Sequence, residues 1–102
     1  MERLVADFVS DGTKVILVNG AESPLLLSRY ADSAYYGAEI DAMRDIAARY
    51  PGVSFHDLSA ALPAEDFNDW HHVNYIGTLK LGPRYAEFIR SLHERVPNSD
   101  KA

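Results

Sequence analysis

The residues that could do chemistry are concentrated in one segment, residues 67–77. Asp69 and His72 stand three positions apart in it, and Asn74 and Gly77 follow. A carboxylate at this spacing can orient an imidazole and fix its tautomer. It also stabilises the imidazolium that forms when the ring takes a proton from a hydroxyl nucleophile. We therefore predict that Asp69 and His72 are the acid and base of a catalytic site, delivered together by one short turn.

The same residues also have structural interpretations. Asp69 can accept hydrogen bonds from nearby backbone N–H groups, and His72 can be a structural histidine. Asn74 is expected to cap a helix under either interpretation, and Gly77 to permit close packing of that helix against the loop.

A divalent metal is the third interpretation of this segment. His71 and His72, with Asp66 and Asp69, provide suitable ligand types. Adjacent histidines seldom chelate one ion, however, and the segment has no dedicated ligand spacing. We therefore expect no metal ion and no cofactor, and we expect the His71 ring either to point elsewhere than His72 or to rest on Trp70.

Composition limits the function classes. The chain has 102 residues, 47% hydrophobic and 25% charged, with a net charge of −5 and no cysteine. This composition fits one small globular domain, and the dispersed acidic charge argues against binding to nucleic acid. No apolar run approaches the ~18 residues of a membrane span, and residues 1–4 do not begin a signal peptide. We expect a soluble chain without a disulfide or an export signal.

Apolar periodicity predicts alternating helices and strands. A short helix around residues 4–9 is followed by a strand at 14–19, and residues 20–29 are predicted as a loop. A long helix at about 32–49 ends at Pro51 and Gly52, and a second strand follows at 53–57. After a loop at 58–70, Asn74 caps a first helical turn, Gly82 interrupts it, and Pro83 begins the closing helix.

This order predicts an α/β fold, a right-handed βαβ unit with flanking N- and C-terminal helices. Two strands are few for an open sheet, so the unit is expected to be part of a flavodoxin-like three-layer sandwich. We assign residues 1–96 to a single domain and residues 97–102 to a flexible tail.

The segment from Val15 to Ile89 resembles the C-terminal part of the SGNH, or GDSL-like, hydrolases. Among these it is most similar to the branch of cell-surface polysaccharide O-acetylation proteins. The family pattern is Phe-x-Asp-x-x-His-x-Asn-x-x-Gly, after a last strand ending in Asp. It is matched by Phe67, Asp69, His72, Asn74 and Gly77, with the strand end at Asp57. The resemblance implies that Asp69 and His72 are the acid and base of a Ser-His-Asp triad, supported by Asn74 and Gly77.

The chain departs from that family where the nucleophile should be. No Gly-Asp-Ser block is present, and the segments that complete the oxyanion hole would precede Lys14. The resemblance therefore implies the C-terminal half of an SGNH-type esterase or O-acyltransferase that acts on a carbohydrate O-acyl group. The isolated chain is expected to be inactive. The alternative is a non-catalytic α/β module that acts in interaction or assembly.

The sequence of the first strand indicates that a further polypeptide pairs with it. Residues 15–18 read as a strand from the middle of a sheet, yet only residues 53–57 are available to pair with it. An unpaired apolar edge invites pairing with another chain. We expect either a homo-oligomer or a complementing N-terminal half.

Overall fold

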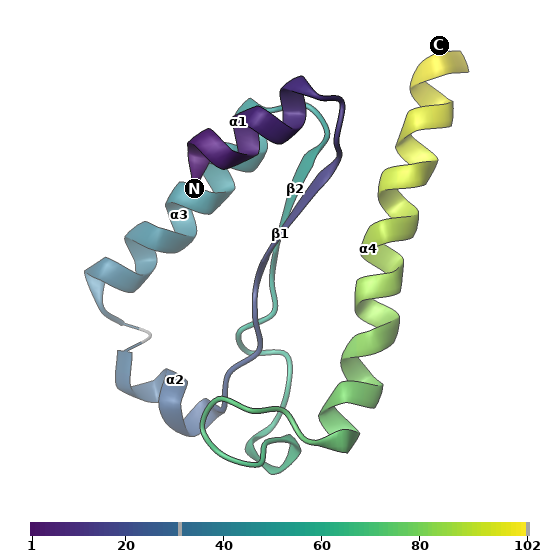
Figure 1. Cartoon of the computed structure of the whole chain (residues 1–102). Coiled ribbons are helices and arrows are strands. Elements are labelled where there is room, and N and C mark those ends of the chain that lie inside the picture. Colours follow the sequence, from purple (N-terminus) through teal and green to yellow (C-terminus); the bar gives the residue numbers. More distant parts are fainter. Residues whose placement is uncertain (31, 102) are drawn as a thin grey trace.

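A computed structural model of the chain describes the backbone of residues 1–30 and 32–101, and the side chains of residues 1–30 and 32–93. Helices and strands alternate through much of the fold (Figure 1). The elements are, in chain order, α1 (Glu2–Ser10), β1 (Val15–Asn19), α2 (Pro24–Tyr30), α3 (Ala34–Arg49), β2 (Val53–Asp57), the 3-10 turn η1 (Ala64–Asp66) and α4 (Tyr75–Lys101).

The two strands pair in parallel, as predicted. The register runs from Val15 opposite Val53 to Asn19 opposite Asp57. In the part of the chain that the structure describes, β1 and β2 form a two-stranded sheet. The α/β class is therefore confirmed, whereas a flavodoxin-like sandwich would need more strands than these residues contain.

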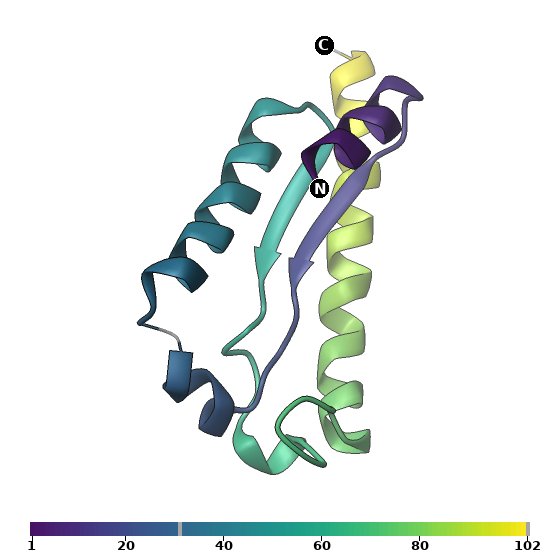
Figure 2. The same cartoon turned by 60° about the vertical axis from the view of Figure 1, so that its left-hand side comes forward.

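Helices lie on both faces of this sheet. α1 and α3 pack on one face, and α4 runs along the other (Figures 1 and 2). Alternate residues of β1 face the two layers, because successive side chains of a strand point to opposite faces. Val15 and Leu17 pack toward the core cluster of Val5, Ile46 and Val53. Val18 packs with the second core cluster, which is formed by Leu58, Leu62 and Leu81.

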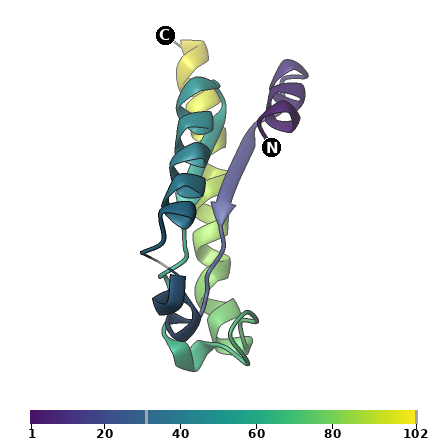
Figure 3. The same ribbon diagram turned by 90° about the vertical axis from the view of Figure 1, so that its left-hand side faces the viewer.

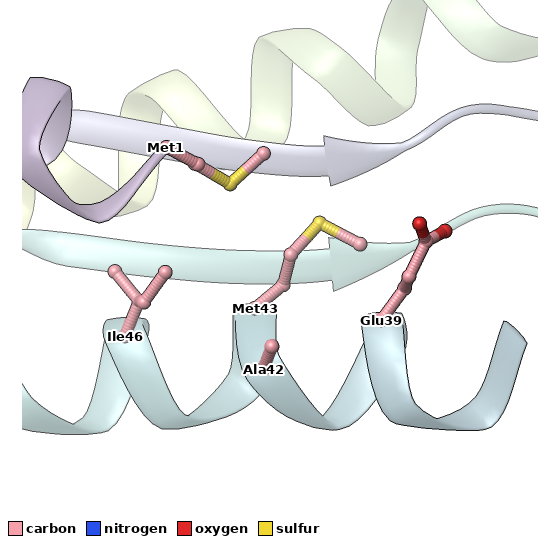
Figure 4. Close-up of a pocket in the computed structure, with 5 residues that line it drawn as sticks. All are labelled: Met1, Glu39, Ala42, Met43 and Ile46. Atoms are coloured by element: carbon pink, nitrogen blue, oxygen red, sulfur yellow. The ribbon is translucent and has the colours of Figure 1, made fainter. Parts of the chain in front are cut away.

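The layer formed by α1 and α3 is incompletely closed. α1 lies on the side of β1, and α3 lies on the side of β2 (Figures 2 and 3). Between them is an apolar hollow of about 280 Å³, seen in Figure 4. Its lining residues are Met1, Glu39, Ala42, Met43 and Ile46. The Met1 side chain is 70% exposed, so this side of the core is open to solvent.

Charged groups join α1 to α3. The Arg49 guanidinium donates to both carboxylate oxygens of Glu2, at 2.6 and 2.9 Å, and the Tyr50 hydroxyl donates to the same carboxylate at 2.9 Å. The hydrogen bonds from Arg49 and then from Tyr50 lower the pKa of Glu2 to about 2. All three groups lie near the surface, so this pair orients the two helices and adds little to stability.

One predicted loop is a helix. Residues 24–30, within the predicted loop at 20–29, form α2. Pro24 occupies its first position, where the missing N–H costs nothing, and the Leu25 N–H donates to the Ser23 hydroxyl at 3.3 Å. The Ser23 carbonyl accepts from the N–H groups of Leu26 and Leu27. The Ser-Pro pair therefore begins a helix, and the prediction of a loop was wrong.

The closing helix is longer than predicted. α4 runs without interruption from Tyr75 to Lys101, so the predicted break at Gly82 and Pro83 was wrong. Proline removes one backbone donor from the ladder of the helix. Side chains on both sides of it, Leu81 and Phe88, hold the two halves against the second core cluster. The predicted tail, residues 97–102, ends outside the described residues, and its flexibility stays a prediction.

None of the helices in the described residues combines the length and the apolar character needed to cross a membrane.

Candidate functional site

Residues 67–73 form a closed loop that carries the predicted dyad. Phe67 and Val73 pair as an isolated antiparallel bridge at its base. The Asn68 N–H donates to the His72 carbonyl at 2.7 Å, across the loop. Phe67 and Val73 also pack against the second core cluster. The loop is thus hydrogen-bonded internally and attached to the core at both ends.

The start of α4 fixes this loop in place. The Asn74 side-chain carbonyl accepts the Gly77 N–H at 3.0 Å, which is the predicted helix cap. The Asn74 amide group donates to the Glu65 carbonyl at 2.9 Å, and its backbone N–H donates to the Asp66 carbonyl at 2.8 Å. One asparagine therefore joins α4, η1 and the loop.

Gly77 lies where a side chain would fit only if its neighbours shifted. A Cβ atom at this position would lie 2.3 Å from Val73 Cγ1, 2.8 Å from the Asp66 carbonyl oxygen and 3.1 Å from Leu62 Cδ1. The predicted close packing of helix and loop is therefore confirmed, and Gly77 acts through packing.

A buried carboxylate ties the same region to α4. The Asp66 side chain is 4% exposed, and the Lys80 ammonium donates to it at 2.7 Å. Charged side chains are rarely buried unless they are paired. The pair holds η1 against the second turn of α4 and gives the Asp66 carboxylate a cationic partner. Sequence reasoning considered Asp66 only as a metal ligand and missed this role, because the two partners are 14 positions apart.

Asp69 and His72 make the contact that their spacing predicts. His72 Nδ1 lies 2.8 Å from Asp69 Oδ2 and 3.0 Å from Oδ1. Since an ionised carboxylate only accepts hydrogen bonds, Nδ1 carries the proton and donates it. The tautomer that this contact selects leaves Nε2 as the unprotonated ring nitrogen.

The carboxylate also organises the turn itself. Asp69 Oδ1 accepts the backbone N–H of His71 at 2.8 Å and that of His72 at 2.7 Å. The hydrogen bond from the His71 N–H is the largest cause that lowers the pKa of Asp69 to about 2, followed by those from the His72 ring and backbone N–H. Asp69 is therefore ionised at neutral pH. The structural interpretation of Asp69 and the dyad geometry hold at the same time.

The pair is open to solvent at the carboxyl edge of the sheet. The side chains of His72 and Asp69 are 76% and 56% exposed. The loop reaches the segment that follows β1, because the Ser23 N–H donates to the Trp70 carbonyl at 3.4 Å. The Arg29 guanidinium of α2 also lies 4.8 Å from the centre of the Trp70 ring. Open α/β sheets bind their ligands at this edge.

The described residues form no cation site around the dyad. Among the described residues, no group of three or more histidine, aspartate or glutamate side chains is placed to hold a metal ion. The His56 ring of β2 stacks on the Phe88 ring of α4, with ring centres 3.7 Å apart.

A polar network at the strand ends was missed by sequence reasoning. The Asn19 side chain donates to the Tyr36 hydroxyl at 2.9 Å and to Asp57 Oδ1 at 3.1 Å. The Ser59 N–H donates to the same oxygen at 3.0 Å. Partial burial raises the pKa of Asp57, but the hydrogen bonds from Ser59 and Asn19 outweigh it and leave this pKa below its usual value. The available signal was that both parallel strands end in a polar residue.

Comparisons with known proteins place the chain in an uncharacterized group. The profile of an uncharacterized protein family matches residues 1–94. One relative is an uncharacterized protein of Leptospira interrogans serogroup Icterohaemorrhagiae serovar Lai (strain 56601), 30% identical over 79 residues. That match covers 78% of this chain but 14% of the relative. No solved structure matches.

These findings overturn the resemblance to SGNH hydrolases. The matching family and the Leptospira relative are both uncharacterized, and neither is an SGNH, hydrolase or esterase match. The family assignment from the five-position motif was therefore wrong, as were the labels hydrolase, esterase and acyltransferase that came with it. The carbohydrate O-acyl substrate loses its basis, because only that resemblance implied it. The contact between Asp69 and His72 does not depend on the family.

Proposed function

The chain belongs to this uncharacterized family, and from that premise we propose that it supplies the general base of an active site. Asp69 orients His72, and His72 Nε2 takes a proton from a hydroxyl nucleophile. The observation that carries this proposal is the contact of 2.8 Å between His72 Nδ1 and Asp69 Oδ2.

The geometry supports a separate role for each ring nitrogen of His72 and for the Asp69 carboxylate. With Nδ1 bound to the carboxylate, Nε2 is the free acceptor of the ring. The ring is 76% exposed, so a reacting group can approach Nε2. When the ring takes a proton, the ionised Asp69 stabilises the imidazolium across the same hydrogen bond. Asp69 itself keeps its charge, because its pKa of about 2 is far below neutral pH.

The nucleophile comes from outside these residues in this proposal. The two buried serines, Ser23 and Ser59, are 2% and 6% exposed, and the Ser23 hydroxyl accepts the Leu25 N–H. The chain spans only 14% of the length of its Leptospira relative, so a whole protein of this kind has ample further residues. We propose that β1 and β2 belong to a wider, flavodoxin-like three-layer sandwich, since helices already lie on both faces of the sheet.

A second candidate function has one specific observation in its favour. Asp69 Oδ1 accepts two backbone N–H groups, so the aspartate has a structural use without any chemistry. In that case the chain is a non-catalytic module for interaction or assembly, and the His72 ring takes no part in its function.

Chemical modification separates the two functions. Diethyl pyrocarbonate reacts with unprotonated imidazole nitrogen, and the neighbouring His71 serves as an internal control. His72 should react several-fold faster than His71 at neutral pH, because the contact with Asp69 fixes the tautomer that presents an unprotonated, exposed Nε2. In Asp69→Asn, this advantage should be lost while His71 is unchanged. Equal rates for the two histidines, unaffected by that substitution, would favour the non-catalytic module.

A further inference from the structure

Within the described residues, the outer edge of β1 has backbone groups without strand partners. The Val15 N–H donates to the Gly52 carbonyl and the Leu58 N–H donates to the Asn19 carbonyl, both at 2.9 Å. Backbone groups of successive residues in a strand point to opposite sides, so Val15, Leu17 and Asn19 face β2. The N–H and C=O groups of Ile16 and Val18 therefore point to the other edge. In the described residues no third strand pairs with them.

On each face of the sheet, beside the outer edge of β1, lies a helix whose apolar surface is only partly buried. In α1, Val5 is buried at 3% exposure, but Leu4 and Phe8 on the adjoining part of the same stripe are 60% and 45% exposed. α1 lies on the β1 side of the molecule (Figure 3). In α4 on the opposite face, Leu79 and Ile89 are 58% and 52% exposed. Two half-covered helices on opposite faces of one strand indicate that the sheet continues past β1.

A hollow lies near the outer edge of β1. About 330 Å³ of space lies between β1 and α4. Its lining residues are Lys14, Ile16, Ile89, Leu92 and His93. It combines Ile16, whose backbone faces the open edge, with the exposed Ile89. Apolar side chains from a neighbouring strand would fill it.

We propose that this edge binds a parallel strand, apolar on both faces, from the polypeptide segment that supplies the missing nucleophile. This inference rests on the proposed function, because it names the partner of the same site. The strand pairs with the backbone of Ile16 and Val18. Its side chains contact Ile89 on one face and Leu4 and Phe8 on the other.

The direction of the added strand follows from the site. The chain that leaves β1 reaches the dyad loop, where the Ser23 N–H meets the Trp70 carbonyl. A strand parallel to β1 ends at this same edge, so the loop after it lies beside Trp70 and can approach His72. An antiparallel strand would bring its amino end there instead. Sheets covered by helices on both faces are typically parallel, which agrees with this direction.

The probe for this edge is a synthetic peptide with the β1 sequence, residues 13–20, flanked by lysines and carrying a nitroxide at its carboxyl end. The readout is amide exchange and line broadening in NMR spectra of the whole chain. Without peptide, the amides of Ile16 and Val18 should exchange much faster than those of Leu17 and Asn19. With peptide, they should become protected, and the nitroxide should broaden the resonances of Trp70.

Two variants make the test specific. Ile16→Pro deletes one outward N–H, which an edge strand tolerates, and should abolish the protection of Val18. Ile16→Ala also removes the isoleucine side chain but keeps the N–H. In this variant the peptide should still protect the Val18 amide. Three results would overturn the inference: no protection at any peptide concentration, broadening at Thr13 in place of Trp70, or concentration-dependent protection without peptide, which would show that a second copy fills the edge. Neither variant alters the Asp69–His72 contact, so diethyl pyrocarbonate reactivity tests the proposed function separately.

Discussion

Gly77→Ala is the substitution for which the structure gives the clearest magnitude. The added Cβ would lie 2.3 Å from Val73 Cγ1 and 2.8 Å from the Asp66 carbonyl oxygen. The valine side chain can rotate, but the backbone carbonyl cannot, because it already accepts the Asn74 N–H. Overpacking of this kind costs about 1–3 kcal/mol, and the fixed backbone favours the upper end. Alanine returns about 1 kcal/mol through its helix propensity, so the net loss should be about 2 kcal/mol.

Gly37→Ala is the matched control for this substitution. Gly37 lies inside α3, and a Cβ there meets nothing within 4 Å. This variant should gain about 1 kcal/mol from helix propensity alone. Urea unfolding of both variants should therefore show free energies of unfolding that differ by about 3 kcal/mol. Equal stabilisation of the two variants would refute the packing of Gly77 against the loop, and with it our account of how α4 positions the dyad.

Three further predictions concern the loop and its chemistry. Asn74→Ala should lower the free energy of unfolding by about 1–2 kcal/mol, because it removes the cap of α4; an unchanged urea midpoint would argue against the cap. The hydrogen bonds of Asp69 should persist at pH 4 and be lost as the pH falls through about 2, because the folded pKa of Asp69 lies below its unfolded value. Carbon NMR of the carboxyl groups measures this, and a midpoint near 4 would contradict it. The isolated chain should hydrolyse p-nitrophenyl acetate no faster than free imidazole at the same concentration, because the proposed site takes its nucleophile from elsewhere; faster turnover that disappears in His72→Ala and leaves an acylated serine would show that a serine of this chain is active.

The strands and the dyad contact were predictable because each depends on local sequence. The run Val15–Val18 is apolar at every position, and Pro51 and Gly52 end the helix before the second strand. Asp69 and His72 meet because one turn carries both. Interactions between distant positions were not predictable in this way. Nothing in a local pattern pairs Asp66 with Lys80.

The errors have physical causes as well. Ser23 and Pro24 led to the prediction of a loop, but serine followed by proline is also a common start of a helix. At Pro83, packing on both sides of the proline outweighs one lost hydrogen bond. Contacts outside the local window therefore decided the outcome at Pro83, whereas at Pro24 the local signals themselves fit both structures.

The family error is the most instructive, because most of the motif has a local structural use. Phe67 forms the bridge that closes the loop, and Asp69 accepts the N–H groups of the turn. Asn74 caps α4, and Gly77 lies where a Cβ would fit only if its neighbours shifted. A short motif of this kind therefore identifies a loop shape that places a histidine beside a carboxylate. It does not identify a family.

The tautomer of His72 tests the central claim most directly. Long-range proton–nitrogen NMR of the neutral ring should show a protonated Nδ1 and an unprotonated Nε2. In Asp69→Asn, the side-chain carbonyl can keep the Oδ1 position and its two backbone N–H bonds. The amide nitrogen then takes the Oδ2 position, 2.8 Å from His72 Nδ1, and donates to it. The proton should then move to Nε2 while the loop stays intact. A wild-type His72 with its proton on Nε2, or a tautomer that this substitution leaves unchanged, would contradict it.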